Sequence, residues 1–304
     1  MRFPLVHVSW ALADNARRPA CDAFFREVFG AKTAYEILVT PETAAMGLDR
    51  EESLLMIGDT MVIPIAPAGR GAEAGNPLGD MLRRSAVPGR WIGLALKVAD
   101  LGEADAWFAA RGFKRHYDPG MEAHYFLVPR RQALGMRLEI VQQDMPNDPR
   151  RDPAWRPGGD DSLGIEGLQA VGVSTPSLAE ARALFADRLE WPAIGERLLP
   201  EARCAAFAMG DTVLEALEGP PGSAIACHAE EVKGIAHLVF KVRDPAAAAD
   251  RLRTAGLPLI GAVETRFAVH PDAAHGRLIW LTGQTPQGYP PVGSRLGTGL
   301  TTLR

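Results

Sequence analysis

Apolar stretches of strand length alternate with amphipathic, helix-like stretches along the whole chain. An apolar strand pattern leads into a helix pattern four times, starting at His7–Trp10, Gly93–Leu96, Ala170–Val173 and His237–Phe240. A residue type that commonly begins helices stands seven positions after the first residue of each strand start: Asp14, Asp100, Ser177 and Asp244. This spacing predicts four repeats of one strand–helix unit.

Each unit continues with further strands, and one of the turns between them is repeated almost exactly. Gly58-Asp59-Thr60 returns as Gly210-Asp211-Thr212, each time just before an apolar strand. The predicted strands are 5–12, 34–39, 53–57, 61–65, 91–98, 113–117, 124–128, 136–142, 168–174, 197–199, 204–209, 212–217, 236–242, 265–270 and 277–282, and the predicted helices are 17–29, 101–110, 178–189 and 245–255. Because repeated units place equivalent positions around a shared axis, residues in matching positions can meet in one pocket.

The repeats divide the chain into two predicted domains. Residues 145–163 contain four prolines and a Gly-Gly-Asp-Asp run, which excludes a continuous helix or a central strand and indicates a linker. We therefore expect an N-terminal domain over 1–144 and a C-terminal domain over 164–285. A Gly-, Pro- and Thr-rich tail over 286–304 is expected to wrap the surface or to be partly disordered.

Composition narrows the class of protein without identifying it. The 304 residues carry a formal charge of -4 and 47% hydrophobic residues, which argues against a nucleic-acid-binding surface. The three cysteines are widely spaced, so a disulfide scaffold is not expected and a reducing compartment fits. With no signal-peptide core and no apolar run of about 18 residues, the expected location is cytoplasmic, away from membranes.

Four strand–helix–strand–strand–strand units on two domains resemble the vicinal oxygen chelate superfamily, which includes glyoxalase I, bleomycin resistance proteins and extradiol dioxygenases. The last domain is most similar to the methylmalonyl-CoA epimerase branch, through Gly210–Glu215, Gly234–Phe240 and the closing hairpin Val269–Ile279. The resemblance implies an α+β fold in which four βαβββ modules pair into two cup-shaped mixed sheets. Because this fold hosts several reactions, it does not by itself imply one of them.

The resemblance also implies where a metal would be held. In this family, each module offers one ligand position on its first strand and one on its fourth, and these positions meet in the cup. Transferred to this chain, the positions are occupied in the first domain by His7, Ile63, Gly93 and Glu139, and in the second by Ala170, Glu215, His237 and Trp280. Each cup thus keeps one His and one Glu, fewer than the three protein ligands of a usual catalytic metal site.

Several nearby residues are candidates to complete these sites. Tyr125 or His124 could face Glu139 from the neighbouring strand, and Arg137 could pair with that carboxylate. The small Gly93 could leave room for a substrate, and Trp280 could stack on an aromatic one, whereas each of these residues could also be purely structural. In the second domain His270 or His275 could supply a further ligand.

The leading functional expectation is an isomerase or lyase that acts on a small molecule with vicinal oxygens. Its catalytic residues would be His7 and Glu139 or His237 and Glu215, with a divalent Zn, Mn, Ni, Co or Fe ion as a possible cofactor. A metal-free His–Glu pair could also act as a general base or be only a structural pair. The alternatives are an extradiol-type ring-cleaving dioxygenase and a metal-free binding or resistance protein, and a homodimer is possible.

Overall fold

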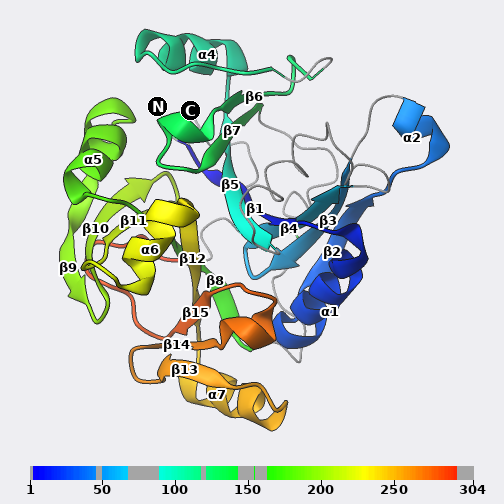
Figure 1. The fold of residues 1–304 in the computed structure, drawn as a ribbon, viewed down its shortest axis with the longest axis vertical. Coiled ribbons are helices and arrows are strands. Elements are labelled where there is room, and N and C mark those ends of the chain that lie inside the picture. The colour runs from blue at the N-terminus through cyan, green and yellow to red at the C-terminus, as the bar shows by residue number, and fades with distance from the viewer. Residues whose placement is uncertain are drawn as a thin grey trace.

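Two curled mixed sheets form the centre of the molecule, with most helices around their outer sides (Figure 1). The computed structural model describes residues 3–45, 50–67, 89–117, 121–142, 154 and 163–292. The architecture confirms the predicted α+β fold with two cup-shaped sheets, one from each half of the chain. Most of the predicted linker, the Gly-rich segment 69–79 and the end of the tail lie outside the described residues.

The first sheet has seven strands in the order β2-β3-β4-β1-β5-β7-β6. Its strands are β1 Leu5–Leu12, β2 Lys32–Ile37, β3 Arg50–Ile57, β4 Thr60–Pro67, β5 Gly89–Val98, β6 Tyr125–Val128 and β7 Arg137–Gln142. The pairs β1/β4 and β5/β7 are parallel, whereas β1 and β5 join the two modules in antiparallel fashion.

The second sheet has eight strands in the order β13-β14-β15-β12-β8-β11-β10-β9. Its strands are β8 Ile165–Ser174, β9 Ala193–Leu199, β10 Ala202–Met209, β11 Thr212–Glu218, β12 Gly234–Val242, β13 Leu259–Ala262, β14 Arg266–Val269 and β15 Ile279–Thr282. The antiparallel pair β8/β12 takes the place of β1/β5, so the second sheet repeats the plan of the first.

Helices begin at the polar residues that the sequence pattern indicated. Asp14, Asp100, Ser177 and Asp244 each accept a hydrogen bond from a backbone N–H two or three residues ahead, which stabilises the first turn. The helices are α1 Arg18–Phe29, α2 Pro41–Ala45, α4 Leu101–Ala110, α5 Leu178–Arg182 with a π-helical continuation Ala183–Arg188, α6 Ala224–Glu231 and α7 Pro245–Thr254. Gly30, with a φ of 63°, ends α1 in the left-handed conformation expected of it.

Some elements differ from the sequence prediction. The strand expected over 113–117 is reduced to a single bridge between His116 and Leu127, so the second module is the least regular. Helices α2 and α6 and strand β13 were not predicted. Helix α6 matters most because it contacts β8, β11 and β12 and covers one end of the second cup.

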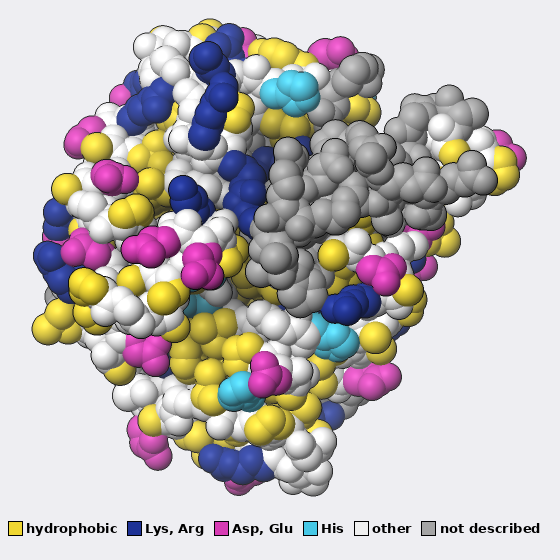
Figure 2. Space-filling view, in the orientation of Figure 1, with side chains coloured by type: hydrophobic (Ala, Val, Ile, Leu, Met, Phe, Trp, Pro, Cys, Tyr) yellow, Lys and Arg dark blue, Asp and Glu magenta, His cyan; other side chains and the backbone are white. Residues whose placement is uncertain are grey.

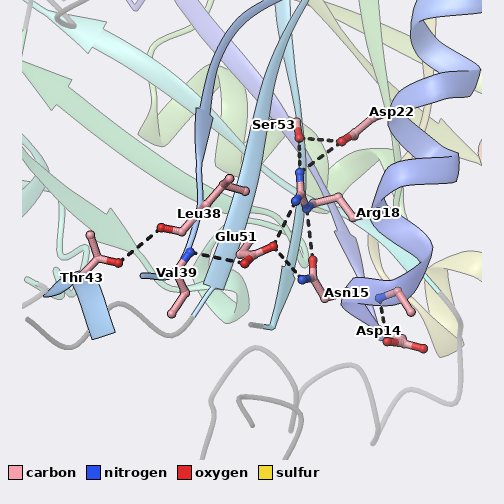
Figure 3. Close-up of polar contacts among 10 residues, drawn as sticks. Asp14, Asn15, Arg18, Asp22, Leu38, Val39, Thr43, Glu51 and Ser53 are labelled. Atoms are coloured by element: carbon pink, nitrogen blue, oxygen red, sulfur yellow. Dashed lines mark hydrogen bonds and ion pairs between the residues drawn. The ribbon is translucent and has the colours of Figure 1, made fainter. Parts of the chain in front are cut away.

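A buried polar network fastens α1 to the outer face of the first sheet (Figure 3). Arg18, at the start of α1, donates to the Ser53 hydroxyl at 2.6 Å and to Glu51 at 3.0 Å, both on β3. Ser53 in turn donates to Asp22 at 2.6 Å. Because these hydrogen bonds link α1 to β3, the helix is held in one register on the sheet.

The repeated Gly-Asp-Thr turns join the two halves of the molecule reciprocally. Oδ1 of Asp59 accepts a hydrogen bond from the N–H of Leu168 at the start of β8, and Oδ1 of Asp211 accepts one from the N–H of Leu5 at the start of β1, both at 2.9 Å. One continuous apolar core extends across both sheets. The duplicated turn is therefore a connection between the two halves.

Candidate functional site

The predicted ligand residues lie in pairs within single cross-strand rows. In the first cup, Ala95 of β5 pairs with both His7 of β1 and Glu139 of β7. In the second cup, Gly172 of β8 pairs with both His237 of β12 and Glu215 of β11. Each pair is therefore separated by one strand that carries a small residue, which lets the two longer side chains approach.

The two histidines occupy the same local backbone feature. The register of β1 shifts between Leu5 and His7, and that of β12 shifts between Ile235 and His237. Such irregularities change the direction of a side chain and occur often beside functional sites. Both pairings shift again two residues later, at Ser9 and Val239, so the duplication has preserved the bulges as well as the strands.

In the first cup, Nε2 of His7 lies 4.0 Å from Oε2 of Glu139. The imidazole is buried, and the carboxylate is about one-quarter exposed. Tyr125 packs beside this pair against Val6, Ala95 and Val141, whereas His124 is exposed. Of these two candidates on the neighbouring strand, the structure thus places Tyr125 on the cup side.

In the second cup, Nε2 of His237 lies 3.8 Å from Oε2 of Glu215, and both side chains are almost fully buried. Oε1 of Glu215 forms an ion pair with Arg197 of β9 and accepts a hydrogen bond from the Tyr289 hydroxyl at 2.8 Å. The 3.8 Å separation is beyond hydrogen-bond distance, so Glu215 acts on the imidazole through its charge. Among the described residues, neither ring nitrogen of His237 has a hydrogen-bond partner.

Burial and the neighbouring charges set the protonation states of this pair. Burial alone raises the pKa of Glu215, but His237, Arg197 and Tyr289 together outweigh it and lower that pKa to about 2. Burial lowers the pKa of His237, and Glu215 offsets this effect only in part. At neutral pH the cup therefore holds an ionised carboxylate beside a neutral imidazole.

A small pocket opens beside His237. It encloses about 270 Å³, its open mouth included, and is lined by Leu199, Glu201, Ala202, Leu217, Ile225, His237, Arg266, Leu278 and Trp280. The Trp280 ring stands edge-on to His237, with 6.4 Å between centroids. Hydrophobic side chains gather on the visible face of this half of the molecule, over the region of β14 and β15 (Figure 2).

The remaining predicted residues lie apart from these pairs or play backbone roles. A Cβ at Gly93 would lie 2.2 Å from the backbone oxygen of Arg137, so close strand packing already explains the glycine. Arg137 is half-buried in that row, and its charge acts on Arg130. His270 is 44% exposed and caps a short helical turn, whereas His275 packs on Phe24 of the first half. Neither histidine completes the second cup.

The second cup does not fit a divalent metal. One oxygen of Glu215 already binds Arg197, and a second guanidinium, that of Arg266, lines the same pocket. Two cations beside one carboxylate repel a third cation. Within the described ranges, no group of three His, Cys, Asp or Glu side chains is arranged to hold a metal ion, so the first cup offers only His7 and Glu139.

Sequence reasoning missed three residues of the second cup. Arg197 belongs to an edge strand, Arg266 follows a turn, and Tyr289 belongs to the tail that was expected on the surface. Tyr289 is only 8% exposed and packs with Ala170, Val213 and Val239. A lone tyrosine in a Gly- and Pro-rich tail was the only signal for it, and that signal is weak.

Comparison with solved structures finds the same architecture in enzymes of known fold. A mutant of 4-hydroxymandelate synthase from Streptomyces coelicolor matches with a TM-score of 0.63 and 15% identity, over 93% of this chain and 94% of that one. The 2,2',3-trihydroxybiphenyl 1,2-dioxygenase from Sphingomonas wittichii strain RW1 matches with a TM-score of 0.58 and 13% identity, over 96% and 97% of the two chains.

A third structure, a xylose isomerase-like TIM barrel/4-hydroxyphenylpyruvate dioxygenase fusion protein, matches with a TM-score of 0.59 and 14% identity, over 95% of this chain and 50% of that one. No family model and no curated protein sequence matches the chain. No helix in the described part of the chain is long and apolar enough to span a membrane. Likeness at these identities shows the fold alone, and the chain thus shares the overall fold of these three structures.

Proposed function

We propose that the second cup is a metal-independent acid–base site that moves a proton next to a carbonyl group of a small molecule. The observation that carries this proposal is the state of His237: a buried, neutral imidazole lines a pocket, and within the described part of the chain neither of its nitrogens has a hydrogen-bond partner. Burying such polar atoms unsatisfied is costly, and functional sites are where that cost is commonly retained. The proposed reaction class is that of an isomerase or lyase.

Each neighbour has a defined part in this chemistry. His237 accepts the proton, and the charge of Glu215 stabilises the imidazolium that forms. Arg197 and Tyr289 hold Glu215 in place and keep it ionised. Arg266, which lines the same pocket, stabilises the negative charge that develops on the carbonyl oxygen.

Proton exchange tests this proposal without knowledge of the complete reaction. Pyruvate and 2-oxobutyrate have exchangeable protons next to a carbonyl, and their loss in D2O is followed by NMR. We expect the purified protein to accelerate this exchange, His237→Gln to abolish the acceleration and His270→Gln, a change at an exposed histidine, to retain it. Pretreatment with a chelator should leave the rate of proton exchange unchanged. Exchange that is equal in His237→Gln, or that depends on added metal, would contradict the proposal.

A metal-free binding protein is the second candidate. This alternative is favoured by the contacts of Glu215, because Arg197 and Tyr289 both bind its Oε1 and hold the carboxylate in one position. Binding of either keto acid without accelerated exchange would support this alternative. The ring-cleaving dioxygenase receives no support from the second cup, because its ligand set and its arginines do not suit iron.

A further inference from the structure

The charges that surround the pocket of the second cup do not balance. Arg197 and Arg266 are both half-buried, and Glu215 is a fully buried carboxylate that pairs with Arg197. Glu201 also lines the pocket, but it is exposed at the β9–β10 turn. The Cys204 thiol stays neutral because burial raises its pKa to about 12. Glu201 acts on Arg266 from the exposed rim, so the excess of one positive charge belongs to the buried and half-buried groups alone.

The excess charge is located on Arg266. Arg197 forms an ion pair with Glu215, whereas within the described residues no ion pair or hydrogen bond is assigned to Arg266. Its guanidinium lies 4.7 Å from the centroid of the Trp280 ring, which holds its plane without using its N–H donors. Burial lowers the pKa of this guanidinium, which remains charged at neutral pH. A half-buried cation with unused donors is poised to bind an anion.

The backbone directs Arg266 into the pocket. Ala268 of β14 lies opposite Trp280 of β15, and Arg266 is two residues before Ala268. Because side chains alternate along a strand, Arg266 and Trp280 share the face of the sheet that also presents His237. The three side chains border the same pocket. An anion held by Arg266 would therefore lie beside the imidazole.

The other residues that line the pocket indicate what the rest of the bound ligand must be. Leu199, Ala202, Leu217, Ile225 and Leu278 give the pocket an aliphatic lining. The volume of about 270 Å³ includes the open mouth, so the enclosed part of the pocket is smaller and admits only a small molecule. An inorganic anion would leave the apolar wall uncovered, and a nucleotide or a coenzyme A ester would not fit inside.

We propose that Arg266 is the specificity-determining residue of the second cup and that it binds the carboxylate of a small organic acid. The short hydrocarbon part packs on the aliphatic wall and on Trp280 and lies beside His237. The carboxylate site names the substrate class of the proposed function. It rests on that function only in so far as the bound acid is also turned over. The binding itself requires the arginine and the wall and does not require acid–base chemistry.

Matched acids and amides test the binding. Propionate and propionamide have similar shapes and differ in charge, and their dissociation constants can be measured by NMR titration of the full chain. We expect propionate to bind at least tenfold more tightly than propionamide, with acetate weaker because it covers less of the wall. Arg266→Gln should weaken propionate binding at least tenfold and leave propionamide unchanged. Arg266→Lys should recover part of the loss, because it retains the charge without the planar fork.

Controls separate this inference from misfolding and from the proposed function. Arg203→Gln removes an arginine of strand β10 that is 57% exposed. This variant should bind propionate as the unchanged protein does. Far-UV circular dichroism and the melting temperature show whether each variant is folded. Equal binding of propionate and propionamide, or full binding by a folded Arg266→Gln variant, would refute the carboxylate site. If the unchanged protein and His237→Gln both bind propionate but the unchanged protein does not accelerate proton exchange, the carboxylate site stands and the proposed function fails.

Discussion

The Asp211 carboxylate accepts a hydrogen bond from the backbone N–H of Leu5, which lies 206 positions earlier in the chain. The equivalent carboxylate of Asp59 accepts one from Leu168 in the other half, so each half of the molecule fixes the first strand of the other. Of these first strands, β1 carries His7, and β8 lies between the strands that carry His237 and Glu215. The connection between halves therefore also determines where the cups are formed.

Removing either carboxylate should destabilise the whole protein. Asp59→Ala leaves a buried N–H without its acceptor and should lower the free energy of unfolding by about 1–3 kcal/mol. Asp211→Ala should cost less, because its hydrogen bond is only partly buried. Urea denaturation measures both changes, and Asp250→Ala, at a 77% exposed position, is the matched control. A greater loss for Asp250→Ala than for Asp59→Ala would show that the turns do not connect the halves.

Gly172 determines how closely Glu215 and His237 approach. A Cβ at this position would lie 2.2 Å from Nε2 of His237, so Gly172→Ala must displace the ring. We expect a loss of stability of about 1–3 kcal/mol, together with a changed titration of His237 by NMR. Gly195→Ala on β9, where a Cβ meets nothing within 4 Å, is the control and should be close to neutral. An unchanged His237 titration in Gly172→Ala would refute the close approach.

Much of the fold follows from the sequence, because periodicity and helix caps are local signals. Strand β1 and helix α4 were predicted with their exact limits, and the four cap residues all begin helices. The pairing of His237 with Glu215 could be expected from the resemblance of the modules. The environment of this pair could not be expected from the sequence. Arg197, Arg266 and Tyr289 come from three separate parts of the chain, which only folding brings together. The bulges at His7 and His237 likewise leave no pattern in one sequence.

Stability should decrease as the pH is lowered below neutrality. Burial lowers the pKa of His228 to about 4, and it also lowers that of His237, so the folded protein keeps both rings neutral. The unfolded chain takes up protons near pH 6.5, and the free energy of unfolding therefore falls between about pH 6.5 and 4. Glu215 acts in the same direction at lower pH, because its folded pKa of about 2 lies below the unfolded value of about 4.3.

His228→Asn tests this dependence. Nδ1 of His228 lies 2.7 Å from the Ser174 hydroxyl, and an asparagine amide can take the same position without titrating. Urea denaturation at pH 7 and at pH 4.5 should show a smaller loss of stability in the variant than in the unchanged protein. An identical loss in both would show that His228 does not contribute to the acid sensitivity.

Tyr289 connects the tail to the buried carboxylate, and two substitutions separate its hydroxyl from its ring. Tyr289→Phe retains the packing with Ala170, Val213 and Val239 but removes the donor to Glu215. A hydrogen bond to a charged group contributes about 1.5–3 kcal/mol, so a loss of that order is expected, together with a higher pKa of Glu215. Tyr289→Ala also removes the ring that lies 5.0 Å from the Arg197 guanidinium, and it should cost more. If Tyr289→Phe is neutral at pH 7 and leaves the acid dependence unchanged, the tail covers the cup through packing alone, and Arg197 suffices to keep Glu215 ionised.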